Sequence, residues 1–311
     1  INGLIKALQY KKKEDYGEPV SIRMDAAKAL GELRAEQAIP LLIEKINHNH
    51  NGLSAAAYTA LEKIGKPAVP WLIAACRAGI TFKTIELLGE LRDVQAVEVL
   101  IISLTHGDEY DRSNAAKALG MIGDNRAVPF LINALNQDSS SVVKASASAL
   151  GELGDPRAVA PLGELIKKTK NSAVDDYIKA LGNIGGVDAG MILISWLESG
   201  EYSHHAKSAL VKIGKPCAGR LLEILNDEKN EHSMRLISAS ILSEIGEKGA
   251  INTLLTWLEY DESPEKTAFK ETAVIALGKL GDPAAIEPLI KMLKTPYRNP
   301  GQKKIVEILG K

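Results

Sequence analysis

The chain has 311 residues, 38 Lys and Arg against 39 Asp and Glu, a net charge of −1 and 5% aromatic residues. This charge balance argues against general binding of polyanions, so we expect no nucleic-acid partner. No apolar run has the length needed to span a bilayer and no signal peptide is visible, which favours a cytoplasmic protein without a membrane span. Cys76 and Cys217 are expected to be small buried residues, too far apart for a disulfide.

One pattern repeats along the chain, and residues 149–162 (ALGELGDPRAVAPL) show it most clearly. They predict the end of one helix, a tight turn and the start of the next. Gly154 can adopt the left-handed conformation that ends a helix, Asp155 can cap free backbone N–H groups, and Pro156 suits a first helical position. The positions equivalent to Gly154 are Arg34, Gly65, Arg92, Gly123, Gly185, Gly214, Gly246 and Gly281. Spacings of 27 to 35 residues, with two helices in each, predict a solenoid.

We count about ten two-helix repeats, starting with an apolar helical pattern at residues 1–8, and no alternating strand pattern. In the fourth repeat, the first helix is expected at about 94–105 and the second at about 109–122. In the seventh and eighth repeats, Val211 and Ser243 replace the first glycine of the predicted turn.

The predicted fold is therefore an all-α solenoid with one domain over residues 1–311. We expect a segment of a longer chain, because the sequence opens inside a helix without a methionine. Imperfectly capped ends would allow end-to-end self-association.

Several copies of the pattern resemble a known repeat type. Residues 26–33 (AAKALGEL), 114–135, 148–162 (SALGELGDPRAVAPL) and 274–293 look like HEAT repeats of the phycobilisome-lyase type, and the resemblance extends over essentially the whole chain. It implies that the second helix of each repeat lines a concave surface. Such repeats occur in lyases, scaffolds and regulatory proteins alike, so the resemblance is specific for the fold rather than for the function.

The sequence contains no motif whose spacing implies catalysis. The Gly-Lys pairs at 65–66 and 214–215 are followed by proline, where a Walker loop needs Ser or Thr. GxGxxG, GxSxG, HExxH and CxxC are all absent from the sequence. We therefore favour a protein without enzymatic activity and expect no cofactor.

Polar side chains from three consecutive repeats form one candidate site on the second helices. They are Asp175, Asp176, His204, His205 and His232. Imidazoles and carboxylates on adjacent helices could converge on a divalent metal. The HEAT-repeat hydroxylase that modifies a lysine side chain uses His-Glu pairs, and this sequence has none. The absence argues against metal-dependent hydroxylation, and the alternative is an ordinary hydrated polar surface.

Apolar residues stand at second-helix positions where the repeat pattern predicts solvent. Leu236, Ile237 and Ile275 form the main group, and Phe82 with Tyr110 forms a weaker one. An exposed apolar patch is typical of a binding surface, whereas a local register shift would bury these side chains.

Our main hypothesis is an interaction scaffold that binds a protein or peptide on the second helices. The resemblance also implies an alternative, a bilin lyase or lyase-like chromophore chaperone, for which Tyr202, His204 and His205 would be the candidate residues.

Overall fold

The fold is given by a computed structural model, which describes residues 1–10, 18–46, 51–79, 82–137, 139–169, 172–198, 203–261, 263–293, 305–307 and 310. These residues form helices and turns, with no strand among them. The protein is an all-α solenoid, as the sequence predicts. Its contacts divide it into two compact bodies, residues 1–169 (body 1) and 170–311 (body 2). The single domain over residues 1–311 stays a prediction.

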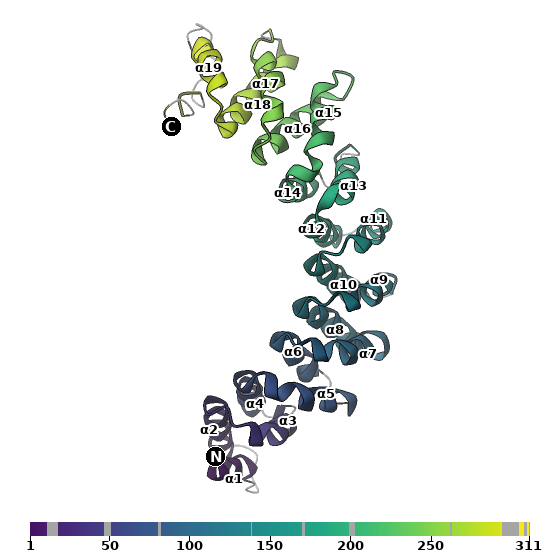
Figure 1. Cartoon of the computed structure of the whole chain (residues 1–311), viewed down its shortest axis with the longest axis vertical. Helices are drawn as coiled ribbons and strands as arrows, with labels where there is room; N and C mark the ends of the chain where they lie inside the picture. Colours follow the sequence, from purple (N-terminus) through teal and green to yellow (C-terminus); the bar gives the residue numbers. More distant parts are fainter. Residues whose placement is uncertain are drawn as a thin grey trace. The chain divides into compact units, whose positions relative to one another are not determined.

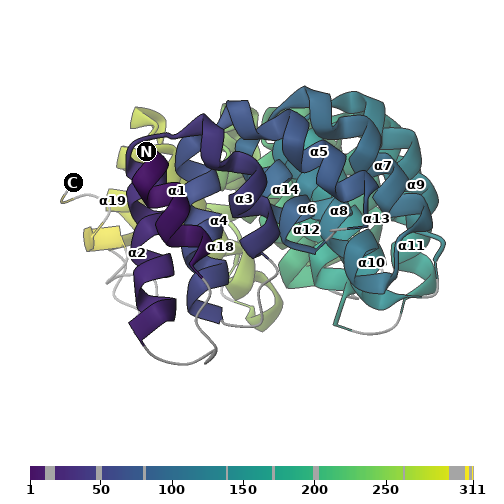
Figure 2. The same ribbon diagram turned by 90° about the horizontal axis from the view of Figure 1, so that it is seen from below.

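Body 1 contains five complete helix pairs and the first helix of a sixth. The helices are α1 (Asn2–Gln9), α2 (Glu18–Glu32), α3 (Ile39–Ile46), α4 (Asn51–Ile64), α5 (Val69–Arg77), α6 (Phe82–Leu91), α7 (Val97–His106), α8 (Glu109–Ile122), α9 (Val128–Ala134), α10 (Ser140–Leu153) and α11 (Val159–Lys168). Each first helix packs on its own second helix, and neighbouring second helices pack on one another. Figure 1 shows this succession, and Figure 2 shows α5, α7 and α9 in one layer and α6, α8 and α10 in another.

Body 2 continues the same pattern from the second helix of the sixth repeat. Its helices are α12 (Val174–Ile184), α13 (Gly186–Glu198), α14 (Ser203–Ile213), α15 (Ala218–Asn226), α16 (His232–Glu244), α17 (Ile251–Leu258), α18 (Pro264–Leu280) and α19 (Ile286–Leu293). The second helices α12, α14, α16 and α18 pack in sequence and present one surface, here called the second-helix surface of body 2. In the described part of the chain, no helix is both long and apolar enough to traverse a membrane.

The predicted turn between repeats is confirmed. Gly154 has φ +68°, and every equivalent position also has a positive φ, including the two that carry arginine, Arg34 (+46°) and Arg92 (+50°). The carboxylate of Asp155 accepts a hydrogen bond from the Arg157 backbone N–H at 2.9 Å. After this turn α11 begins at Val159, whereas α13 begins directly after Gly185, at Gly186.

The predicted helix bounds need one correction at the start of the first helix. In the fourth repeat, α8 spans Glu109–Ile122 as expected, but the first helix opens with a 3-10 turn, Val94–Ala96, and becomes α-helical at Val97. Pro156 likewise lies in a 3-10 turn, Pro156–Ala158, ahead of α11. Asp93 and Asp155 cap this turn by accepting a hydrogen bond from the second N–H after them, whereas the same turn after Gly65 and Gly214 has no side-chain cap.

The repeat contains a second glycine, three residues before the turn position, and this glycine lies inside the second helix rather than in the turn. A Cβ on Gly31, Gly89 or Gly120 would lie 2.6 to 2.9 Å from the Cα of an alanine on the next second helix. The three partners are Ala60, Ala118 and Ala149. Close packing of small residues thus sets the spacing between second helices. Our prediction that this glycine belongs to the turn is wrong. The Gly, Ala and Leu residues of the repeat motif all lie in the second helix and face neighbouring helices.

Candidate functional site

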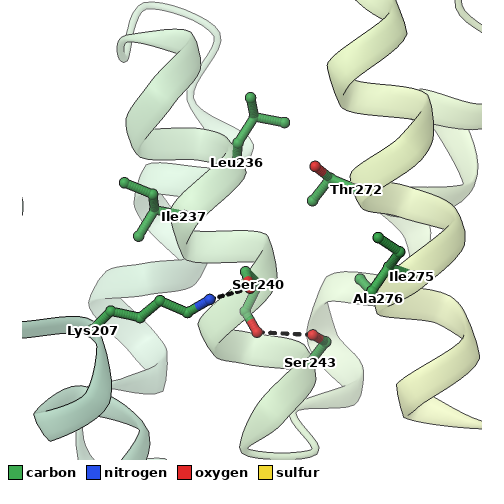
Figure 3. A pocket seen from close by; sticks show the side chains of 8 residues that line it. All are labelled: Lys207, Leu236, Ile237, Ser240, Ser243, Thr272, Ile275 and Ala276. Atoms are coloured by element: carbon green, nitrogen blue, oxygen red, sulfur yellow. Dashed lines mark hydrogen bonds between the residues drawn. The ribbon is translucent and has the colours of Figure 1, made fainter. Parts of the chain in front are cut away.

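The apolar residues on α16 and α18 line a pocket on the second-helix surface of body 2. Its volume is about 210 Å³, and its lining consists of Lys207, Leu236, Ile237, Ser240, Ser243, Thr272, Ile275 and Ala276. Leu236 and Ile237 are half-buried, and Ile275 is 43% exposed. Leu236 points from α16 toward α18, whereas Ile237 lies on the side of Lys207 (Figure 3). We call this the second-helix pocket.

The pocket lies at a position where the repeat loses its small-residue contact. Ser243 occupies the place of the helix-contact glycine, and its partner by register is Ala276. In body 2, a Cβ on the equivalent Gly182 would lie 2.9 Å from the Cβ of Ala209. Ser243 instead places a hydroxyl there, which donates a hydrogen bond to the Ser240 carbonyl at 2.8 Å, and both serines line the pocket.

Charged side chains border the pocket. The Lys207 ammonium donates a hydrogen bond to the Ser240 hydroxyl at 2.7 Å and lies 3.4 Å from a carboxylate oxygen of Glu244. Lys279 binds the same oxygen at 3.1 Å. Burial alone would raise the pKa of Glu244, but the hydrogen bond from Lys279 and the charges of Lys207 and Lys279 lower it. Two lysines sharing one carboxylate leave a net positive charge beside the apolar residues.

The five candidate metal ligands do not form one cluster. His205 Nδ1 lies 3.2 Å from an Asp175 carboxylate oxygen, and the His204 and His205 rings are 5.8 Å apart. His232 instead packs edge-on against Phe269, with ring centroids 5.0 Å apart. Throughout the described residues, no three His, Cys, Asp or Glu side chains come close enough together to hold a metal ion.

The Phe269 ring, which packs against His232, belongs to an aromatic cluster that we did not predict from the sequence. Phe269 contacts Trp257 and Tyr260 edge-on, at centroid distances of 4.6 and 5.8 Å. The Arg235 guanidinium lies over the Trp257 and Phe269 rings, and its Nε donates to the Leu225 carbonyl at 3.0 Å. The cluster joins α16, α17 and α18 beneath the surface. The sequence does contain a signal for this cluster, since three of the chain's few aromatic residues fall within residues 257–269.

The remaining candidates lie apart from the pocket. In body 1, Phe82 is 47% exposed and Tyr110 is 76% exposed. Tyr202 lies outside the described residues. Cys76 and Cys217 are buried and free, as predicted, and burial raises the pKa of both thiols, which disfavours the nucleophilic thiolate.

Comparisons with known proteins agree on the repeat type. A family model described as HEAT repeats matches residues 3–80, 82–151 and 218–309, and one described as PBS lyase HEAT-like repeat matches residues 142–168. No curated protein sequence matches the chain at a significant level.

Two solved structures are among those similar to this chain. Human deoxyhypusine hydroxylase in complex with glycerol has 20% identity, covers 81% of this chain and 99% of its own, and has a TM-score of 0.36. The complex of CpcE and CpcF of phycocyanin lyase from Nostoc sp. PCC7120 has 21% identity, covers 88% of this chain and 93% of its own, and has the same TM-score, 0.36. Neither similarity assigns a ligand or an activity to this chain.

Proposed function

From the premise that the chain belongs to the HEAT repeat family, we propose that it is an interaction scaffold that binds a protein or peptide on the second-helix surface of body 2. The observation that carries the proposal is the second-helix pocket, which is lined by Leu236 and Ile237 of α16 and Ile275 of α18. Solenoids use such extended helix surfaces for binding, with a repeated core and variable exposed positions.

The size and chemistry of the pocket suit a side chain of a partner protein. A leucine or phenylalanine buried there would contribute about 1.5–3 kcal/mol to binding, the magnitude of a single anchor residue. The net positive charge of Lys207 and Lys279 around Glu244 favours a partner with a carboxylate next to that anchor. The bilin and hydroxylase alternatives stay predictions, because no contact among the described residues specifically favours them.

The proposal is tested by capture of partners from source-cell lysate with the native chain and with a Leu236→Asp, Ile237→Asp variant. A partner that binds the native chain and is lost from the variant, while circular dichroism shows unchanged helicity, supports the pocket as the contact. The matched control is Met191→Asp, which alters a 45% exposed side chain on the first helix α13. Equal capture by all three chains would overturn the proposal.

A further inference from the structure

A second opening on the same surface lies between α12 and α14, on the other side of α14 from Lys207. Its volume is about 330 Å³, and its floor contains the small or apolar residues Ile178, Gly182 and Ala209. Four charged side chains and His205 line its sides. We call it the charged groove.

The charges in this groove are separated along its length. Asp175 and Asp176, in the first turn of α12, line one end beside His205. Lys179 follows one turn later on α12, and Lys212 lies near the end of α14, where its ammonium hydrogen-bonds the Asn183 side chain. Asn183 is neutral, so this hydrogen bond does not compensate the charge of Lys212. The two aspartates therefore lie at one end of the groove, Lys212 lies at the other end, and Lys179 lies between them.

The register of the two helices gives the spacing of the ends. His205 pairs with Asp175, and Lys212, seven residues after His205, pairs with Asn183. Seven helical residues advance about 10 Å along the axis. An extended peptide covers about 10 Å in three residues. A helical ligand, which is about 10–12 Å wide, does not enter between packed helices whose axes are about 8–10 Å apart.

We propose that the charged groove is a second binding site, distinct from the second-helix pocket, for an extended peptide segment with a basic and an acidic residue three positions apart. The Lys or Arg of the segment pairs with Asp175 at the acidic end, and its Asp or Glu pairs with Lys212 at the far end. Small or apolar residues between them lie over Gly182 and Ala209. The complementarity lies in the order of charges along the groove, because the total charge of the two Asp and two Lys is zero.

The test is an array of nine-residue Ala/Leu peptides in which one Arg and one Glu are separated by one to six positions, probed with the purified full chain. We expect strongest retention at a separation of three, about fivefold above a separation of one, and loss of this preference at high salt. Arg–Arg and Glu–Glu peptides of the same spacing are the sign controls. Retention that is independent of spacing would overturn the proposal.

Charge-reversed variants distinguish loss of the site from loss of folding, because each is expected to gain a new preference. The Lys179→Glu, Lys212→Glu variant is expected to prefer Arg–Arg peptides, and the Asp175→Lys, Asp176→Lys variant is expected to prefer Glu–Glu peptides. A gained preference requires a folded groove, whereas unaltered preferences in both variants would contradict the proposal. The Leu236→Asp, Ile237→Asp variant should keep the native peptide preference. Failure of the proposal for the second-helix pocket can therefore be distinguished from failure of the proposal for the charged groove.

Discussion

At the scale of single residues, backbone conformation explains the repeating turn. Gly123, Gly154 and Gly281 end their helices in the left-handed region, with ψ between 18° and 30°. Gly65 and Gly214 combine a positive φ with ψ of −141° and −136°, a region that side chains other than glycine hardly enter. Arginine can replace glycine in the first kind of turn, at a cost in strain, but not readily in the second.

This difference predicts opposite effects of substitution at two kinds of turn. Arg34→Gly and Arg92→Gly should each raise the free energy of unfolding by about 0.5–1 kcal/mol, because they relieve a left-handed side-chain clash. Gly214→Ala should lower it by about 1–3 kcal/mol. Urea unfolding followed by circular dichroism measures all three. Destabilisation by both arginine replacements would show that their side chains stabilise the turn by other contacts.

Capping carboxylates give the turns a predictable pH dependence. Hydrogen bonds from the Arg157 side chain and backbone lower the pKa of Asp155 below its ordinary value, and Arg126 does the same for Asp124. Because the folded-state pKa is the lower one, the stabilisation is complete above the unfolded value of about 3.9 and is lost as the pH falls through the folded value.

Asp155→Asn should therefore reduce the acid sensitivity of the fold. The amide keeps a cap acceptor but does not titrate, so the difference in urea midpoint between native and variant chains should be smaller at about pH 3 than at about pH 5. Asp25→Asn is the control, since Asp25 is an exposed carboxylate on α2 outside any cap. A constant difference at both pH values would contradict this role of the charge.

At the scale of helices, close contacts of small residues set the spacing of second helices. Gly182→Ala should destabilise the chain by about 1–3 kcal/mol, because the new Cβ would lie 2.9 Å from the Cβ of Ala209. Gly219→Ala is the matched control, since it adds a Cβ into open space in α15 and should stabilise by up to about 1 kcal/mol. Thermal unfolding of the two variants compares them directly, and equal effects would show that the contact is not tight.

The sequence predicts much of this element-scale structure. The left-handed turns and the bounds of α8 follow from short patterns of local residues. The 3-10 turns that precede most first helices were not predicted, because hydrophobic periodicity does not separate them from α-helix. The aromatic cluster around Phe269 and the separation of His232 from His205 depend on side-chain directions across three helices, which no local pattern encodes.

At the scale of the whole molecule, each second helix combines a repeated buried side with a variable exposed side. The buried alanines and leucines explain why the HEAT repeat pattern matches most of the chain. The exposed side holds the pocket at Leu236 and the groove at Asp175 in body 2. The sequence predicted the apolar residues Leu236, Ile237 and Ile275 on this side, but not that Ser243 and Ala276 line a pocket with them.

The measurement that tests the second-helix pocket most directly is site-specific photocrosslinking in source-cell lysate. Benzoylphenylalanine replaces Ile275 in the pocket or Met191 on a first helix, two side chains of similar exposure, 43% and 45%. We expect a discrete crosslinked partner from position 275 and none from position 191. Equal crosslinking from both positions, or none from position 275, would contradict binding at this pocket.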